Sequence, residues 1–224
     1  MERIIEQMPI VLGALNSGFL QTLRLFFITL IGAVPLGLVI AFGSMSKFRP
    51  LSMLSKFIVW IIRGTPLMIQ LLIIFYFPGL VLHKQIWGGG ETGRFLAASL
   101  SFILNYACYF SEIYRGGIQS VPAGQEEAGL VLGMTKTQIF FKVKLMQMIK
   151  RIVPPMSNEI ITLVKDTSLA FTLSVMEMFS IAKMLAASQS NMIPFIAAGL
   201  FYYVFNLIVA LAMEGLEKKL NYYQ

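Results

Sequence analysis

Two carboxylates share one face of an apolar segment in the second half of the chain. Glu159, Thr162 and Asp166 are spaced i, i+3 and i+7, so on a helix they form a single stripe. Like charges that lie close together in apolar surroundings repel each other unless a cation joins them. The stripe therefore indicates a site for the amine or cationic side chain of a substrate. Alternatively, it is a structural cluster neutralised by Arg63 or by Lys165 of the partner subunit.

A second candidate site is the sequence Arg63-Gly64-Thr65-Pro66, which interrupts another apolar stretch. Thr65 suits an N-cap and Pro66 suits the first helical position, so the backbone N–H groups of Leu67 and Met68 would remain free. A helix start of this kind binds carboxylates, and transporters with broken helices place such starts near the middle of the membrane. The break thus predicts a site for a substrate carboxylate. The alternative is that Pro66 only kinks a packed helix.

Further polar residues in apolar segments need partners, because an ionisable group in a membrane helix costs about 2.5–3.5 kcal/mol on insertion scales. Glu112 and Arg115 are three residues apart, which favours a structural ion pair over contact with a substrate. Arg63 could pair with Glu112 or with Asp166, or it could guide an anionic group. Asn105 could receive the amine or side chain of the substrate.

The composition shows that these residues lie in a membrane protein. Of the 224 residues, 57% are hydrophobic and 13% are charged, about half the charged fraction of an ordinary soluble domain. A soluble globule is therefore excluded. The formal net charge of +7 is expected of a multispan protein with basic cytoplasmic loops and does not indicate nucleic acid as a partner. The single cysteine, Cys108, excludes an intrachain disulfide and a paired-thiol metal site.

The apolar runs predict an all-α membrane helix bundle that forms one transmembrane domain over residues 1–224. Five spans are expected, roughly at residues 20–43, 57–82, 95–114, 157–182 and 193–213, and the second is broken at residues 63–66. Lys and Arg gather in residues 47–56, 136–151 and 218–219, so these parts should be cytoplasmic. The N-terminus is then outside and the C-terminus is cytoplasmic. Glu177, near the outer end of the fourth span, is expected to be a gate or surface residue.

Residues 120–150 form an amphipathic loop that is too long for a simple connection between spans. Pro122 and two acidic residues suit the start of a short helix, and Gly133 should end it. Thr135 is the expected N-cap of a second helix with one apolar and one basic face, and Pro154-Pro155 should end the loop. Such a loop could lie on anionic lipid or could dock a partner protein.

The spacing within this loop resembles the E-A-A, three residues, G, nine residues, I-x-L-P signature of ABC importer permeases. The matching residues are Glu127-Ala128-Gly129, Gly133 and Val143-Lys144-Leu145, whereas Gly129 replaces an alanine and Met146 replaces the proline. In that family the loop forms a coupling helix that sits in a cleft of the cytoplasmic ATPase. The resemblance therefore assigns coupling to the ATPase to six residues: Glu127, Ala128, Gly129, Gly133, Val143 and Leu145.

Four other segments are similar to the polar amino-acid permeases, the branch that includes histidine, glutamine and arginine importers. They are Arg63-Gly64-Thr65-Pro66-Leu67, Glu112-Ile113-Tyr114-Arg115-Gly116-Gly117-Ile118, Val121-Pro122-Ala123-Gly124-Gln125 and Leu163-Val164-Lys165-Asp166-Thr167-Ser168-Leu169. The resemblance implies a second permease subunit, identical or a sister chain, together with two cytoplasmic ATPase subunits. It also implies an extracytoplasmic amino-acid-binding protein and a location in the bacterial cytoplasmic membrane, in contact with lipid.

The chain is not expected to be an enzyme. It lacks the G-x-x-x-x-G-K-[ST] phosphate loop, so ATP should be bound by the partner ATPase and no cofactor is expected in this chain. The only histidine, His83, lies in a loop, and no metal or catalytic cluster is apparent. We therefore predict a permease subunit that imports polar amino acids, with arginine, lysine or histidine favoured over glutamine or cystine. The alternative is an amino-acid exporter or a bundle like that of a secondary transporter.

Overall fold

The computed structural model describes residues 2–220, with the side chains of residues 2–8 and 10 excluded. Within residues 2–220 the chain forms helices and no strand, which confirms the predicted all-α fold. The α-helices are α1 (Glu2–Ser44), α2 (Arg49–Arg63), α3 (Leu67–Leu80), α4 (Gly90–Gln119), α5 (Gly124–Val131), α6 (Lys136–Ile139), α7 (Leu145–Asp166), α8 (Met178–Gln189) and α9 (Ile193–Leu220). A π-helical turn, η1 (Phe140–Lys144), and a 3-10 helix, η2 (Thr167–Leu173), lie on either side of α7.

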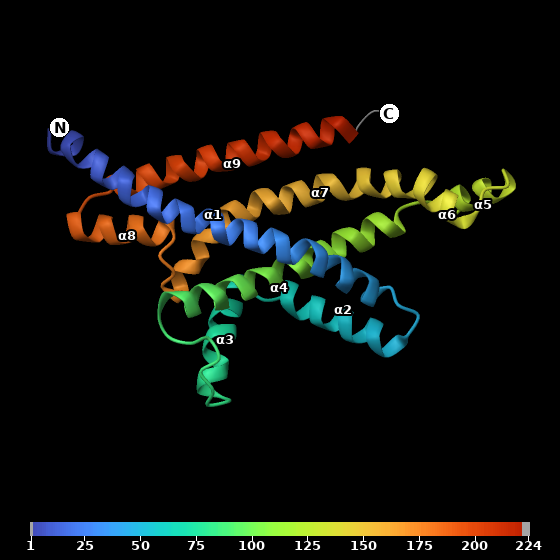
Figure 1. Cartoon of the computed structure of the whole chain (residues 1–224), viewed down its shortest axis with the longest axis horizontal. Helices are drawn as coiled ribbons and strands as arrows, with labels where there is room; N and C mark the ends of the chain where they lie inside the picture. The colour runs from blue at the N-terminus through green and yellow to red at the C-terminus, as the bar shows by residue number, and fades with distance from the viewer. Residues whose placement is uncertain (1, 221–224) are drawn as a thin grey trace.

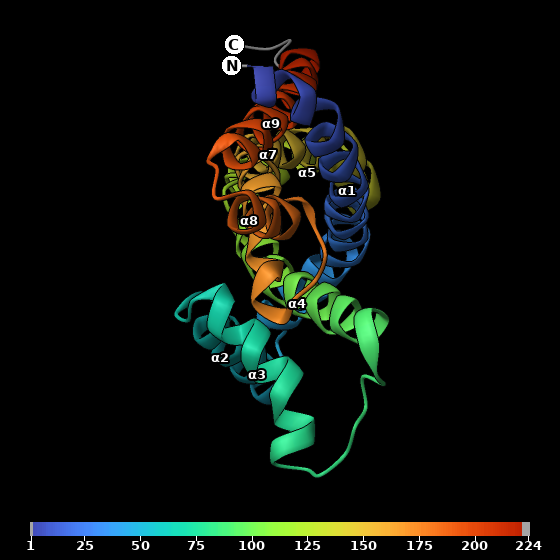
Figure 2. The same cartoon turned by 90° about the vertical axis from the view of Figure 1, so that its left-hand side faces the viewer.

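Four long helices determine the shape of the molecule. Helices α1, α4, α7 and α9 run along its long axis, and α1 packs along α4 (Figure 1). Helices α5 and α6 project from the end at which α9 finishes, whereas α8 and the start of α1 lie at the opposite end. Viewed along the long axis, α2 and α3 lie on one side of the other helices (Figure 2). The short elements are thus divided between the two ends and one flank.

The candidate membrane spans reach the predicted number of five only when bent helix pairs are counted as single spans, and several boundaries differ. Among residues 2–220, three helices are long and apolar enough to cross a membrane, and the number rises to five if each of two bent helix pairs counts as one span. Helix α1 begins well before residue 20, and α4 extends beyond both ends of the predicted range 95–114. Helix α9 begins at Ile193, as predicted, and continues past residue 213. The second span is broken as predicted, with an angle of 110° between α2 and α3.

The fourth span differs from its predicted form at both ends. Pro154 and Pro155 lie inside α7 and do not separate the loop from the span, so that prediction was wrong. A proline removes only its own N–H donor, and the remaining hydrogen bonds allow a membrane helix to continue. At the other end, Ser174 adopts a φ of 54° and the chain bends by 59° into α8. The predicted continuous span over residues 157–182 is therefore two helical segments.

A buried carboxylate fixes this bend. Glu177 is completely buried and caps α8, because its side chain accepts hydrogen bonds from the backbone N–H groups of Phe179 and Ser180, both at 2.7 Å. The hydroxyl of Tyr202 on α9 donates to the same carboxylate at 3.1 Å. The expectation that Glu177 is a gate or surface residue was wrong, because capping the free N–H groups of α8 draws it inside.

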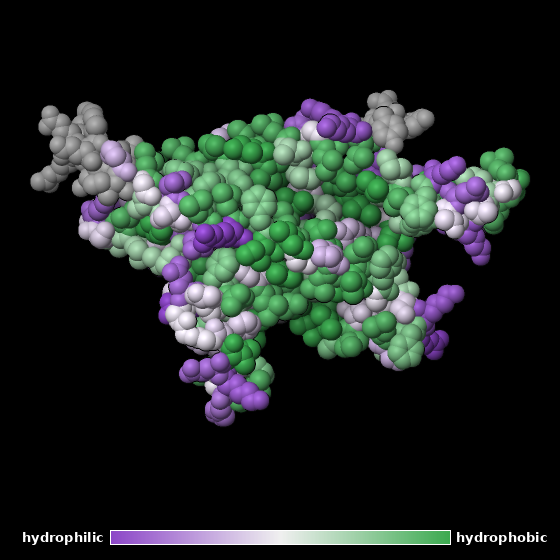
Figure 3. Space-filling view, in the orientation of Figure 1, coloured by the Kyte–Doolittle hydropathy of each residue, from purple (hydrophilic) through white to green (hydrophobic). Residues whose placement is uncertain are grey.

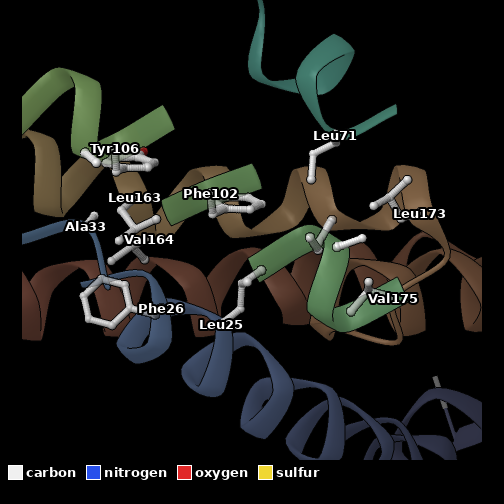
Figure 4. Packing of buried hydrophobic residues seen from close by; sticks show 14 of the residues in the cluster. Leu25, Phe26, Ala33, Leu71, Phe102, Tyr106, Leu163, Val164, Leu173 and Val175 are labelled. Carbon is white, nitrogen blue, oxygen red and sulfur yellow. The ribbon is translucent and has the colours of Figure 1, made fainter. Parts of the chain in front are cut away.

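The larger of two buried apolar clusters joins most of the long helices. Phe26 of α1, Leu71 of α3, Phe102 of α4, Leu163 of α7 and Leu173 of η2 all belong to it (Figure 4). The outer surface is also largely apolar along the long helices, and hydrophilic residues are prominent at the projecting ends (Figure 3). A surface of this kind is suited to lipid along the middle of the molecule and to water at its ends.

Candidate functional site

A buried glutamine braces the corner between α2 and α3. The Gln70 side-chain amide donates hydrogen bonds to the carbonyl of Ile62 at 2.7 Å, the carbonyl of Thr65 at 3.0 Å and the Thr65 hydroxyl at 2.9 Å. These contacts satisfy carbonyls that the end of α2 leaves without helical partners. Sequence reasoning missed Gln70, although a lone amide in the otherwise apolar helix α3 was a signal that it must find a polar partner.

Thr65 does not cap α3, which corrects the predicted carboxylate site. Its hydroxyl donates to the carbonyl of Ile61 at 3.0 Å, and Pro66 occupies the N-cap position without a side-chain cap. The carbonyls at the end of α2 are near enough to compete successfully for the hydroxyl. Leu67 and Met68 remain at the helix start, where Leu67 packs against the core and Met68 is exposed. Thr65 is therefore not the N-cap, and the carboxylate site at Leu67 and Met68 stays a prediction.

Asn105 belongs to the same braced corner. Its side-chain amide donates to the Gln70 side-chain oxygen at 3.0 Å, and the residue is only 5% exposed. The hydrogen bond links α4 to the break between α2 and α3. Asn105 therefore has a structural role at this corner, and its contact with the substrate stays a prediction. A buried amide that already has a protein partner would have to break that bond to bind a ligand.

The carboxylate stripe lies on α7, as its spacing predicted. Asp166 accepts a 2.7 Å hydrogen bond from the hydroxyl of Tyr106 on α4, and Glu159 lies about two helical turns earlier on α7. Both carboxylates are half-buried, and the Thr162 hydroxyl between them donates to the carbonyl of Asn158 at 2.9 Å. Tyr106 was missed because nothing in its local sequence indicates that α4 turns it towards α7.

Arg63, the last residue of α2, lies among these acidic groups. Its Nη1 atom is 3.9 Å from the Glu112 carboxylate, and its guanidinium carbon is 5.0 Å from the centre of the Tyr109 ring. Arg115 contacts Glu112 more closely, with its Nε atom donating at 3.0 Å. The structure thus contains the Glu112–Arg115 pair and places Arg63 with Glu112. It does not pair Arg63 with Asp166.

A cavity of about 540 Å³ opens beside these ion pairs. It lies between α2 and α4, and three cationic side chains and one carboxylate contribute to its lining. The lining residues are Lys56, Val59, Trp60, Arg63, Gly64, Glu112 and Arg115. Polar groups gather here between helices whose outer faces are apolar, which is typical of a pathway for polar solutes through a membrane bundle.

The loop predicted to couple forms a tight helical hairpin. Gly133 has a φ of 70° and ends α5, and the N–H of Met134 donates back to the carbonyl of Gly129 at 3.0 Å. Thr135 caps α6 in a reciprocal capping box with Gln138, which confirms the predicted N-cap. Gly129 is buried against Ile139, and a Cβ at residue 129 would lie 2.6 Å from the Ile139 Cγ1 atom. A glycine therefore allows α5 and α6 to pack closely where the family signature has alanine.

Polar contacts fasten this hairpin to the start of α7. Lys144 forms an ion pair with Glu126, which lowers the pKa of the Glu126 carboxyl and keeps it ionised at neutral pH. The side-chain amide of Gln147 donates to Gln125 at 3.2 Å. The hairpin and α7 are thus joined side by side as well as through the turn η1.

The hairpin presents an apolar tip to solvent. Val131 and Leu132 are 87% and 79% exposed, and Glu127 and Ala128 are exposed beside them. Of the other residues expected to couple, Gly133 is exposed, Gly129 is buried, and Val143 and Leu145 are half-buried. Sequence reasoning missed Val131 and Leu132, although apolar residues immediately before a helix-ending glycine were a signal of a contact surface.

Comparisons with known proteins identify relatives over nearly the whole chain. Residues 33–222 match the family described as the binding-protein-dependent transport system inner membrane component. The chain is 37% identical over 212 residues to the L-cystine transport system permease protein TcyB of Bacillus subtilis, covering 93% of this chain and 87% of that protein. It is 34% identical over 219 residues to the arginine transport system permease protein ArtQ of the same organism, covering 97% and 95%.

Solved structures share this arrangement of helices. A chain in the crystal structure of an amino acid ABC transporter with histidines superimposes with a TM-score of 0.83 at 28% identity, and the match covers 97% of both chains. A chain of the inward-facing MetNI methionine ABC transporter matches with a TM-score of 0.69 at 17% identity, covering 96% of this chain and 98% of that one. The second likeness is one of fold alone.

Proposed function

Because this chain belongs to the family of binding-protein-dependent transport system inner membrane components, we propose that it forms part of an ATP-driven pathway that prefers cationic amino acids. It is a transmembrane subunit of an amino-acid ABC importer and a multispan protein of the bacterial inner membrane. This membership replaces the alternatives of an exporter or a secondary transporter. The preference for arginine, lysine or histidine is the proposed part, because the relatives include permeases named for cystine, arginine and glutamine.

We propose that the α5–α6 hairpin and the C-terminal end of α9 face the cytoplasm, and that the N-terminus is outside. The hairpin and the end of α9 lie at the same end of the molecule (Figure 1). Lysines at residues 136, 142 and 144 lie at this end on α6 and η1, and residues 218 and 219 of α9 are also lysines. Basic residues at the cytoplasmic ends of helices set the orientation of multispan proteins, which supports this assignment.

The proposed substrate site joins the start of α3 to the stripe on α7. Gln70, near the start of α3, is bonded to Asn105, and the neighbouring Tyr106 is bonded to Asp166, which links the helix start to one end of the stripe. The backbone N–H groups of Leu67 and Met68 are suited to the substrate carboxylate. Glu159 and Asp166 are suited to the cationic side chain, with Thr162 between them. The observation that favours a cationic substrate is that this stripe carries two carboxylates and no cation of its own on the same face.

The exposed hairpin is the proposed contact with a separate ATPase subunit. Its apolar tip at Val131 and Leu132 is suited to a protein cleft, and Glu127 and Ala128 form the adjoining surface. The family implies a second permease subunit, ATPase subunits and a binding protein, and we propose two ATPases in the complex. Because the hairpin is tied to the start of α7, movement of the ATPase would be transmitted to the helix that carries the carboxylate stripe.

Reconstitution tests this function directly. The permease, its ATPase and its binding protein in proteoliposomes should hydrolyse ATP faster when an amino acid is added, and labelled amino acid should accumulate. A panel of arginine, lysine, histidine, glutamine and cystine would identify the substrate. Uptake driven by an ion gradient without ATP would contradict the proposed mechanism. A preference for glutamine or cystine over all three cationic amino acids would contradict the proposed specificity alone.

A further inference from the structure

Helix α2 is amphipathic, and its polar face is turned towards the protein. Four residues spaced i, i+4, i+7 and i+11 share this face: Ser52, Lys56, Val59 and Arg63. Ser52 donates a 2.6 Å hydrogen bond to a backbone carbonyl of α1, and Val59 is buried. The opposite face carries exposed apolar side chains such as Trp60. Cations on the inner face of a membrane helix indicate a space that admits water and polar solutes.

The cavity of about 540 Å³ lies between this face and α4. Gly64, at the break between α2 and α3, is part of its lining, and Glu112 and Arg115 belong to the C-terminal part of α4. Helix α4 leads from there to the α5–α6 hairpin. The cavity therefore lies between the break and the proposed cytoplasmic end of the molecule. A substrate that moves from the start of α3 towards the cytoplasm would meet this cavity next.

The charges that line the cavity do not balance. Three side chains of the lining are cationic and one is a carboxylate. Arg115 is fully engaged, because it donates to Glu112 at 3.0 Å and to Gln119 at 3.2 Å. Arg63 approaches Glu112 only to 3.9 Å, which is too long for a hydrogen bond, and Lys56 forms neither a hydrogen bond nor an ion pair with any of residues 2–220. The cavity therefore has a surplus of positive charge that attracts an anionic group.

The two surplus cations are placed to hold one carboxylate between them. Lys56 and Arg63 are seven residues apart on the same face, which is about 10 Å along the helix axis, and both side chains are exposed to the cavity. Long, flexible side chains at this spacing can converge on one small anion, and a guanidinium binds a carboxylate through two parallel hydrogen bonds. Every amino acid carries such a carboxylate, whatever its side chain. Because Arg115 occupies Glu112, the lining offers no free carboxylate to a cationic side chain.

We propose that the cavity between α2 and α4 is an exit site that binds the carboxylate of an amino acid on the cytoplasmic side of the pathway. Lys56 and Arg63 bind the carboxylate, and the Glu112–Arg115 pair forms the opposite wall. Amino acid that accumulates in the cytoplasm also fills this site and slows the next transport cycle. The inference rests on the proposed transport function and adds to it a product inhibition that does not depend on the side chain.

The experiment adds amino acids to the cytoplasmic side of the reconstituted complex. Proteoliposomes contain the binding protein and the amino acid that stimulates the complex best, and ATP is added outside, so that only complexes whose ATPase faces the medium are active. ATP hydrolysis is measured while L-arginine, L-citrulline or L-argininamide is added to the medium. Citrulline resembles arginine in shape but has a neutral side chain, and argininamide keeps the side chain but lacks the carboxylate. Arginine and citrulline should inhibit at similar concentrations, and argininamide should need at least a roughly fivefold higher concentration.

Variants of the two cations show whether the inhibition arises in this cavity. Lys56→Gln should raise the half-inhibitory concentrations of arginine and citrulline about fivefold, the change that corresponds to an ion pair of about 1 kcal/mol. Lys56→Arg keeps the charge and should keep the wild-type values. The matched control is Lys47→Gln, which removes an exposed cation in the turn before α2, outside the cavity lining, and should change nothing. Arg63→Gln should act like Lys56→Gln, and Lys56→Gln decides the question if the loss of Arg63 prevents assembly.

The results also separate this inference from the proposed function. Stimulation of ATP hydrolysis by the enclosed amino acid, before any is added outside, tests the function alone. Absence of inhibition from the medium, equal inhibition by argininamide, or unchanged inhibition in Lys56→Gln would overturn the exit site. Inhibition by arginine without inhibition by citrulline would mean that the side chain is recognised, which also overturns it. So would an effect of Lys56→Gln that appears only as an altered dependence on anionic lipid, because a lipid phosphate would then be the ligand of the cavity.

Discussion

Replacing Gly129 by alanine should weaken the contact of the hairpin with the ATPase. A Cβ at this position would lie 2.6 Å from the Ile139 Cγ1 atom and 2.9 Å from its Cδ1 atom. Ile139 is 1% exposed, and a β-branched side chain in a helix has one strongly preferred χ1 rotamer, so it cannot easily turn away. Overpacking of this kind costs about 1–3 kcal/mol. This free energy is lost from the packing of α5 against α6, so the exposed tip of the hairpin is displaced.

The effect should be visible as a change in affinity between the two subunits. A penalty of about 1–3 kcal/mol corresponds to at most a roughly 5- to 150-fold weaker association, reached when the ATPase binds only the native hairpin and the free variant abandons it. Association is measured by titrating purified ATPase onto the permease in nanodiscs, and coupling is measured as amino-acid-stimulated ATP hydrolysis. The double variant Gly129→Ala/Ile139→Ala should be less impaired than the sum of the single effects, because the second change removes the clashing atoms.

Normal association and normal stimulation in Gly129→Ala would refute this reasoning. The result would mean either that the two short helices separate at little cost or that the hairpin is not the ATPase contact. The Ile139→Ala variant distinguishes these cases, because loss of a buried isoleucine side chain should loosen the hairpin by about 2–5 kcal/mol. If that variant also couples normally, the hairpin does not bind the ATPase.

Three other variants test the remaining parts of the site. Gly133→Leu should reduce coupling while membrane insertion is retained, because a left-handed turn costs a leucine about 1–2 kcal/mol. Coupling is measured as ATP-driven uptake, and normal uptake by this variant would contradict the prediction. Glu159→Gln should weaken arginine binding more than citrulline binding, and equal effects would make Glu159 structural. Gln70→Leu removes the hydrogen-bond partners of the Thr65 carbonyl and the Asn105 side-chain amide and should lower the thermal inactivation temperature of the complex, at about 1–3 kcal/mol for each group. The exposed Gln85→Leu is its control, and equal stability of the two variants would contradict the bracing role.

The sequence by itself determined the class of protein and the positions of its main features. Long apolar runs can satisfy their backbone hydrogen bonds in lipid only as helices, so the all-α bundle followed from composition and run length. The break after Arg63, the turn at Gly133 and the N-cap at Thr135 were also local. Each depends on the conformational or hydrogen-bonding preference of one residue and its immediate neighbours, which a sequence shows directly.

Only the tertiary structure decided which polar groups meet. The Thr65 hydroxyl could cap α3 or donate to a carbonyl of α2. In the structure it donates to the Ile61 carbonyl of α2, and it accepts a hydrogen bond from the Gln70 side chain of α3. Asn105 and Tyr106 lie on α4, and their partners are on α3 and α7. Such contacts depend on how helices distant in the sequence pack. The carboxylate stripe was therefore predictable from its spacing along one helix, whereas its neighbours were fixed by the fold.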